Sequence, residues 1–179
     1  METLLETGLL HEVILRHARM ADLVVLGRSG AAHGGSFAGL GSTVDRVLRA
    51  SPTPVLLAPV DYVELEGAVL GYNALESAVR AMHTLALLAK PLGLRVRVVS
   101  VHEDPVQAGA WALEAETYLK GQGIATEVLA FAGDPAEHLL SLQEPSDLLA
   151  LGALVRRLVL GSTAEYVVRH AVGPVLTAR

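Results

Sequence analysis

Cysteine is absent from the 179-residue sequence. Its absence excludes disulfide bridges, thiolate zinc sites and a cysteine nucleophile together. Lysine is scarce, and the 14 lysines and arginines are outnumbered by 19 acidic residues, which gives a formal net charge of −5. The basic residues are scattered, whereas a nucleic-acid-binding protein carries them in a patch or stripe, so we expect no nucleic-acid partner.

Long hydrophobic runs are also lacking. No uncharged apolar stretch approaches the roughly 18 residues that a membrane-spanning helix needs, so we expect no membrane association. The first residues, Met-Glu-Thr-Leu-Leu-Glu, lack the basic start and apolar centre of a secretory signal, which favours a cytoplasmic protein. Hydrophobic residues nevertheless make up 51% of the sequence, as in a folded globular domain.

An internal repeat is the main feature that the sequence does contain. Residues 8–27 align without gaps with residues 133–152, and residues 41–59 align in the same way with residues 161–179. We call these the first copy and the second copy. Gly41 lies fourteen positions after Gly27, whereas Gly161 lies nine positions after Gly152, so the second copy has lost five residues there.

The second copy belongs to a regular alternation of strands and helices. Short apolar or β-branched segments predict strands at residues 68–72, 95–101, 127–131, 148–151 and 174–177. Helical spacing predicts helices between Leu75 and Pro91, over residues 111–121, from Asp134 onward and over residues 162–171. This alternation predicts a doubly wound α/β fold, in which helices cover both faces of a parallel sheet.

The first copy supplies only the tail of this pattern. We expect strands at residues 2–6, 22–26 and 55–57, with helices at 9–20 and 43–50. Residues 1–60 would thus be the carboxyl half of one repeat, and residues 61–179 a complete second repeat. Such a half repeat leaves strand edges unpaired and buries little surface alone. We therefore expect it to lean on the complete repeat or on another chain, unless the native protein begins upstream of Met1.

A glycine-containing segment leads from a strand into a helix in each copy. Glycine lets a phosphate approach the backbone, and a helix start offers free N–H groups and the positive end of its dipole. In the first copy this segment holds Gly27, Gly30 and Gly41, and the hydroxyls of Ser42 and Thr43 add donors. It is neither a Walker loop nor the Gly-x-Gly-x-x-Gly dinucleotide turn.

A purely structural interpretation competes with this phosphate site. Ser42 with Asp45, and Ser162 with Glu165, have the spacing of capping boxes, so these residues could serve only to start helices. His102-Glu103-Asp104 follows a predicted strand, but three neighbouring side chains rarely converge on one metal ion. No nucleophile elbow or catalytic triad is present, so we expect no enzyme.

The glycine pattern resembles the ATP-binding signature of the universal stress protein family. It stands as Gly27-Arg28-Ser29-Gly30, ten residues, Gly41-Ser42-Thr43 and, after a helix, Pro54-Val55-Leu56, with a spacer one residue longer than usual. The second copy repeats it as Gly152, Gly161-Ser162-Thr163 and Pro174-Val175-Leu176. The resemblance covers nearly the whole chain. It implies a Rossmann-like fold of the tandem-repeat type, with the first repeat truncated at its amino end.

Membership would imply a bound adenine nucleotide, ATP or AMP, with Mg²⁺ as an optional companion. Asn73 stands where the family usually has a ribose-contacting aspartate, and the backbone of Val101 would meet adenine. Leu151 and Gly152 would line the neighbouring strand. The phosphates would lie on the glycine segments, whose residues are Gly27, Gly30, Gly41, Ser42 and Thr43 in the first copy and Gly161, Ser162 and Thr163 in the second.

Each copy lacks part of this site. The second has Val155 in place of the second glycine and a shortened spacer, whereas the first has no adenine-binding strands. We hypothesise that the first repeat, when whole, is the nucleotide site and that the second is a packing partner. This chain alone would then bind weakly, or not at all unless a neighbouring subunit completes the pocket.

Two functions follow from these observations. The first is a nucleotide-binding protein that regulates or protects during stress. The alternative is a nucleotide-free dimerisation module of the same family. In the family the last strand of a repeat pairs with its counterpart, so we expect a homo-oligomer joined through residues 54–59 and 174–177.

Overall fold

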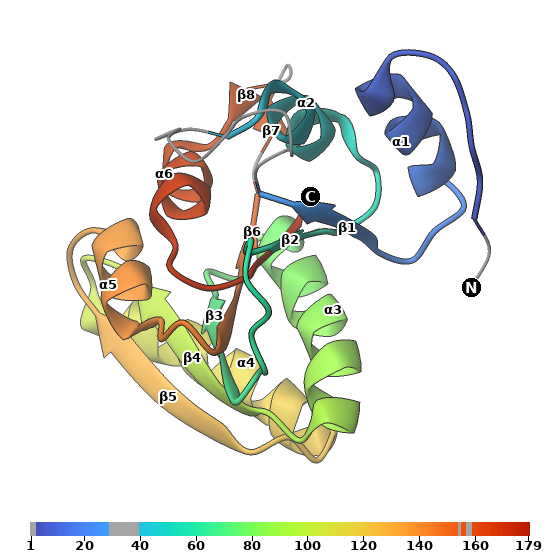
Figure 1. Ribbon diagram of the computed structural model, residues 1–179. Helices are drawn as coiled ribbons and strands as arrows, with labels where there is room; N and C mark the ends of the chain where they lie inside the picture. The colour runs from blue at the N-terminus through green and yellow to red at the C-terminus, as the bar shows by residue number, and fades with distance from the viewer. Residues whose placement is uncertain (1–2, 29–39, 154, 157–158) are drawn as a thin grey trace.

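The computed structural model describes residues 3–28, 40–153, 155–156 and 159–179 of the chain. Seven described strands form one sheet in the order β1-β2-β9-β6-β3-β4-β5, and β7 and β8 form a separate pair (Figure 1). The strands of the large sheet are β1 (Val24–Gly27), β2 (Val55–Ala58), β3 (Gly67–Gly71), β4 (Arg95–Val101), β5 (Thr126–Phe131), β6 (Asp147–Gly152) and β9 (Val175–Ala178). Every neighbouring pair in this sheet is parallel except β2 and β9. The predicted α/β fold is confirmed.

The helices cover both faces of the sheet. Packed against one face are α1 (Leu10–Ala18), α2 (Ser42–Ala50), α5 (Pro135–Leu142) and α6 (Ser162–His170). The other face carries α3 (Glu76–Leu92) and α4 (Pro105–Gly121). Alternate residues of one strand belong to the two cores, so Leu148 lies in the core that includes α3 and α4, and Leu149 in the core that includes α2 and α6. A strand buried on both faces in this way is continuously apolar, as β6 is.

Two helix starts show how the sequence fixes the connections after strands. The Asp134 carboxylate accepts a hydrogen bond from the Ala136 N–H at 2.7 Å, and proline follows at the first helical position, as predicted. Asp104 does the same for Val106 at 2.9 Å, so α4 begins six residues earlier than its apolar spacing indicated. At the far end of α3, Gly93 adopts φ 66° and ends the helix.

The first copy joins the second through the middle of the sheet. Val55 pairs with Thr177, and Leu57 with Val175, in the antiparallel contact between β2 and β9. Arg28 donates to the carbonyls of Ala171 and, at 2.6 Å, Gly173, beyond the end of α6. Arg179 donates to the carbonyl of Arg49 near the end of α2 at 3.2 Å. The first copy thus leans on the second, as expected.

This pairing corrects the expected route of oligomerisation. We expected residues 54–59 and 174–177 to join two chains, but β2 lies between β1 and β9, and β9 between β2 and β6. Both strands therefore have partners on both sides within the chain. The fold closes this pair intramolecularly because the two copies bring one such strand each.

One local expectation was wrong, and one element was not anticipated. Residues 3–6 form no strand, because the counterpart of their expected neighbour β4 is missing from the first copy. Glu6 instead contacts α1, where its carboxylate bonds Arg16 and lies 2.6 Å from His17 Nε2. The spacer after β6 contains a hairpin that the sequence did not reveal, formed by β7 (Val155–Arg156) and β8 (Val159–Leu160).

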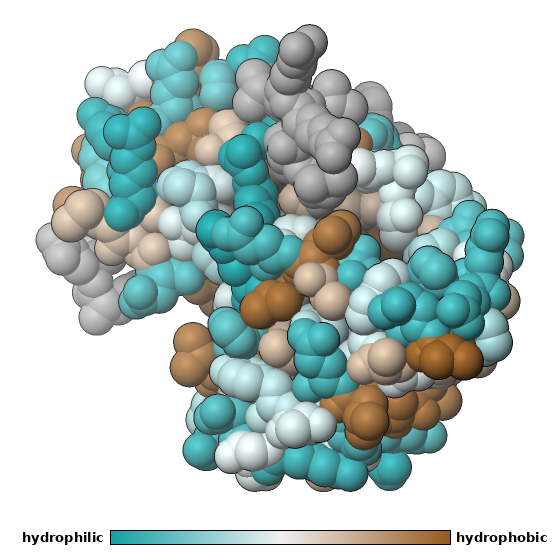
Figure 2. Space-filling model, turned by 180° about the vertical axis from the view of Figure 1, so that it is seen from behind, coloured by the Kyte–Doolittle hydropathy of each residue, from teal (hydrophilic) through white to brown (hydrophobic). Residues whose placement is uncertain are grey.

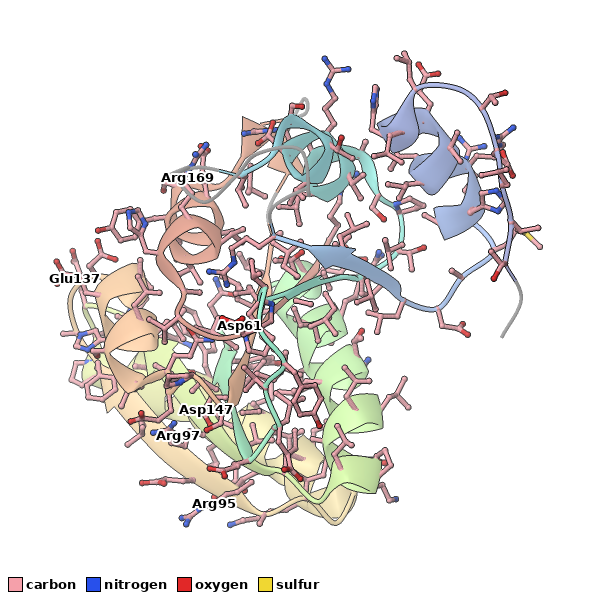
Figure 3. All side chains as sticks on the ribbon, viewed as in Figure 1. Asp61, Arg95, Arg97, Glu137, Asp147 and Arg169 are labelled. Atoms are coloured by element: carbon pink, nitrogen blue, oxygen red, sulfur yellow. The ribbon has the colours of Figure 1, made fainter. Side chains whose placement is uncertain are left out.

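An ion pair lies at the amino-terminal ends of the strands, and the edge strand β1 is partly exposed. At the amino-terminal ends of the strands, Arg97 and Asp147 point toward each other and form an ion pair (Figure 3). At the sheet edge, β1 has one described partner, and Val25 is 57% exposed although its counterpart Ala150 is fully buried.

Seen from behind, apolar side chains lie in separate spots among polar ones (Figure 2). No described helix is both long and apolar enough to cross a bilayer.

Candidate nucleotide site

A cavity of about 270 Å³ lies at the carboxyl ends of β3, β4 and β6, beside the start of α6. Ligands of doubly wound sheets bind at this edge of the sheet. The lining residues are Gly71, Tyr72, Asn73, Leu75, Ser77, Val99, Val101, Pro135, Leu139, Leu151, Gly152, Gly161, Ser162, Thr163 and Ala164. The volume is slightly below the range of roughly 300–1,000 Å³ that small-molecule pockets occupy.

All the site residues that we predicted in the second repeat line this cavity: Asn73, Val101, Leu151, Gly152, Gly161, Ser162 and Thr163. The predicted first-copy residues Gly27, Gly41, Ser42 and Thr43 do not. Gly30 lies outside the described residues. The cavity is therefore lined by residues between Gly71 and Ala164, whereas we hypothesised that the site lies in the first repeat.

The loop after β3 is held from both sides. The carbonyl of the buried Tyr72 accepts a hydrogen bond from Ser100 Oγ at 2.8 Å, and its hydroxyl donates to Glu114 on α4. Burial, together with this bond and the Glu114 charge, raises the pKa of Tyr72 above its ordinary value. Asn73 Oδ1 accepts from the Leu75 N–H at 3.3 Å. Asn73, which we expected to contact a ribose, thus uses its side-chain carbonyl in the turn that leads into α3.

Glycine is required at Gly152 by packing alone. A Cβ there would stand 2.5 Å from the Ala78 nitrogen and 2.6 Å from Ser77 Oγ, because the first turn of α3 crosses β6 at this point. Gly41 differs, since a Cβ would meet nothing within 4 Å and its φ of −58° suits any residue. Neither backbone conformation nor described neighbours explain the glycine at position 41.

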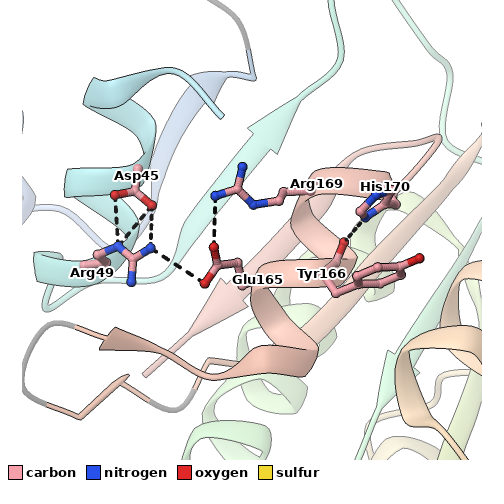
Figure 4. A network of polar contacts seen from close by, with 6 residues as sticks. All are labelled: Asp45, Arg49, Glu165, Tyr166, Arg169 and His170. Carbon is pink, nitrogen blue, oxygen red and sulfur yellow. Dashed lines mark hydrogen bonds and ion pairs between the residues drawn. The ribbon is translucent and has the colours of Figure 1, made fainter. Parts of the chain in front are cut away.

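The two capping boxes of the purely structural interpretation do not form at the described helix starts. Gly41 and Gly161 are the N-caps of α2 and α6, and no side-chain cap bond is made at either described helix start. Ser42 and Ser162 are already helical, one position too late to cap. Asp45 instead bonds Arg49, and Glu165 bonds Arg169 at 2.9 Å, while a 3.8 Å contact links Glu165 to Arg49 (Figure 4). The first N–H groups of α6 thus receive no cap bond from a described side chain.

The cavity wall is uncharged throughout its described lining. No cluster of potential metal ligands occurs among the described residues. In the His102-Glu103-Asp104 segment, His102 Nδ1 accepts from the Asp104 N–H at 3.0 Å, and Asp104 caps α4. The polar groups that face the cavity are therefore amides, hydroxyls and backbone N–H groups.

Sequence reasoning missed the wall that α5 supplies. Pro135 and Leu139 line the cavity, and a Cβ on Gly71 would stand 3.0 Å from a methyl group of Leu139. The capping signal at Asp134 predicted where α5 begins but not which side chains it turns toward the strand ends. Leu139 corresponds to Ile14 in the first copy, so the alignment marked it only as a core position.

Comparison with known proteins decides the family. The model of the "Universal stress protein family" matches residues 2–59 and 106–179. The chain belongs to the universal stress protein family. It is 31% identical over 167 residues to a universal stress protein of Synechocystis, covering 88% of this chain and 58% of the relative. The chain thus spans a little over half the length of that relative.

Solved universal stress proteins share the fold. A crystal structure from Archaeoglobus fulgidus matches with a TM-score of 0.76 and 22% identity, over 94% of this chain and 66% of that one. A universal stress protein in complex with cAMP matches with a TM-score of 0.53 and 24% identity, over 63% of this chain and 94% of that one.

Proposed function

We propose that this universal stress protein binds an adenine nucleotide, ATP or AMP, in the second-repeat cavity and acts in the stress response without catalysis. The observation that carries the proposal is the convergence of the second-repeat positions inferred from the family resemblance on one cavity. A family member solved with cAMP supports it by showing that a protein of this fold takes an adenine nucleotide.

The lining residues divide into three parts in this proposal. Val99, Val101 and Leu151 offer an apolar wall to adenine, and Asn73 offers its amide N–H₂ to the ribose, since its carbonyl bonds Leu75. The uncapped start of α6 offers N–H groups and the Ser162 and Thr163 hydroxyls to phosphate. Mg²⁺ would have no carboxylate ligand among the described lining residues and would be held by phosphate and water.

We further propose that residues 1–60 are the carboxyl half of one repeat and residues 61–179 a complete one, in a cytoplasmic protein of the tandem type. The matching element order supports this, since α1-β1-α2-β2 in the first copy corresponds to α5-β6-α6-β9 in the second. The antiparallel β2–β9 pair then takes the place of a contact between separate repeats.

The nucleotide-free interaction module remains the second candidate, and the uncharged cavity wall and the single-partner edge of β1 favour it. Release of bound nucleotide distinguishes the two. The purified protein is denatured, and the supernatant is analysed for adenine nucleotides per chain, followed by titration of the native protein with ATP and AMP. Near-equimolar release, or saturable uptake, supports the proposal. A nucleotide-free protein that takes up neither compound contradicts it.

A matched pair of variants locates the site. Gly161 and Gly41 are equivalent N-caps with φ values near −60°, so leucine fits the backbone at both. At Gly161 the new side chain would project beside the cavity, and we expect affinity to fall by at least about tenfold, which is about 1.4 kcal/mol. Gly41→Leu is expected to leave affinity unchanged. The reverse result would place the site in the first copy. Circular dichroism spectra show whether both variants fold.

A further inference from the structure

Strand β1 forms the outer edge of the large sheet on the side of the first copy (Figure 1). The N–H groups of Val24 and Arg28 donate to carbonyls at the two ends of the β2 segment, at 2.9 and 3.0 Å. Backbone groups of successive residues point to opposite sides of a strand that lies in a sheet. The N–H and C=O of Val25 therefore point away from β2, toward the outer side of the sheet.

The equivalent strand of the second copy pairs on both of its sides. β1 corresponds to β6, which lies between β9 and β3. Ala150 on β6 is the counterpart of Val25; it pairs with Leu70 of β3 and is fully buried. Val25 is 57% exposed. The position at which β6 receives its second neighbour is thus accessible to solvent on β1.

β1 is better suited to receive another strand than β5, the strand at the opposite edge. Its four residues, Val24–Gly27, carry no charge. β5 carries Glu127, whose carboxylate lies 3.4 Å from Arg95 in an exposed ion pair. Charged side chains on an edge strand oppose the addition of a further strand, whereas an uncharged edge is a template for one. A strand that joins this sheet is therefore expected at β1.

We propose that two copies of this chain associate through β1, as an antiparallel strand pair about a two-fold axis at Val25. This register places Val25 opposite the partner's Val25, and the exposed Asp22 opposite the partner's Arg28. The described bonds of the Arg28 guanidinium go to neutral carbonyls, so the carboxylate supplies an opposite charge at each end of the pair. A register centred on Val24 would instead place Asp22 opposite the partner's Leu26.

Two-fold pairing closes with two chains, whereas pairing of β1 with β5 of another chain would continue without end. Main-chain hydrogen bonds would supply much of the affinity, as in other cases of strand addition. A strand of four residues offers limited area, so we expect a reversible dimer with a Kd on the order of 10 μM. The proposal concerns assembly and is independent of nucleotide binding.

Analytical ultracentrifugation over a concentration series that spans this Kd tests the association. Val25→Lys should weaken the dimer at least about tenfold, because lysine opposes strand addition and two like charges would meet at the axis. Val60→Lys is the matched control, since Val60 is an apolar residue that is 81% exposed between β2 and β3. We expect it to leave the Kd unchanged. Circular dichroism spectra show whether both variants fold.

Disulfide formation tests the register independently. The sequence contains no cysteine, so Val25→Cys introduces a single thiol. Directly opposed residues of a hydrogen-bonded antiparallel pair have Cα atoms about 5.5 Å apart, which is within the range of disulfides. Under mild oxidation we expect Val25→Cys to form a covalent dimer much faster than Val60→Cys.

Four outcomes overturn the proposal in different ways. A wild-type chain that stays monomeric throughout the series shows that β1 does not associate. A dimer that Val25→Lys leaves intact has its interface elsewhere. A dimer that Val25→Lys weakens but Val25→Cys does not cross-link overturns the register centred on Val25. Assemblies larger than a dimer that Val25→Lys disperses overturn the two-fold arrangement and indicate pairing of β1 with another edge.

Discussion

Replacing Arg28 with methionine removes a bridge between the two copies while keeping an apolar stem of similar length. The guanidinium donates to the carbonyls of Ala171 and Gly173, and each such bond contributes about 1.5–3 kcal/mol. Its Nε is buried without a partner among the described residues, and removing that group returns about 1–3 kcal/mol. At the middle of these ranges the two bonds outweigh that return, so we expect the free energy of unfolding to fall by about 2–3 kcal/mol.

Urea denaturation followed by circular dichroism measures this change, and the melting temperature should fall by roughly 4–12 °C for a protein of this size. Arg46→Met is the matched control, because Arg46 is exposed on α2 and its described polar contact is His11 at 3.1 Å. We expect the control to change stability by less than about 0.5 kcal/mol. If Arg28→Met costs no more than Arg46→Met, the Arg28 bridge does not stabilise the junction, and the other contacts between the copies carry it.

Two further changes test the walls of the cavity. Gly152→Ala forces a Cβ to within 2.6 Å of α3 and should lower the free energy of unfolding by about 1–3 kcal/mol. Gly109→Ala, inside α4 with open space around it, should raise the free energy of unfolding by about 0.5–1 kcal/mol. Chemical denaturation of both variants checks this, and equal effects would refute the packing argument. The raised pKa of Tyr72 predicts that stability declines as pH rises above about 10, because the unfolded state then loses a proton that the folded state keeps. Tyr72→Phe should flatten that decline in denaturation curves between about pH 9 and 11, by up to about 1.4 kcal/mol per pH unit, and an unchanged slope would count against the buried hydroxyl.

Local sequence signals were sufficient to predict a helix or strand where the chain also supplies the neighbours against which that element packs. The β-branched run from Arg95 to Val101 predicted β4 with its observed bounds, whereas α3 continues through Pro91, where we expected it to end, and stops at Gly93. Residues 3–6 have a similar apolar pattern but form no strand, because a strand also needs a neighbour and the chain supplies none there. Ser42 and Ser162 would cap their helices only if each helix began one residue later than it does. Spacing alone does not resolve such a shift.

Some residues of the candidate site could likewise be predicted from the sequence, and others could not. The ends of parallel strands meet at one edge, so the positions of Asn73, Val101 and Leu151 follow from topology once the strands are known. Leu139 does not, since its side chain reaches the cavity through the packing of α5 on the sheet. The hairpin at β7–β8 was also hidden, because its stability depends on burial of Leu160 against α2, a residue range more than a hundred positions earlier.

The position of β9 has a consequence for how the chain folds during synthesis. β9 comes last in sequence among the strands of this sheet and is inserted between β2 and β6, so the two sides of the sheet become joined only after residues 175–178 have been synthesised. Until then β2 and the helices beside it expose apolar surface that has no partner, and contacts so distant in sequence form slowly. Ribosome-bound chains that stop before Val175 should therefore remain protease-sensitive over residues 3–58, although residues 67–152 already contain neighbouring strands that can pair.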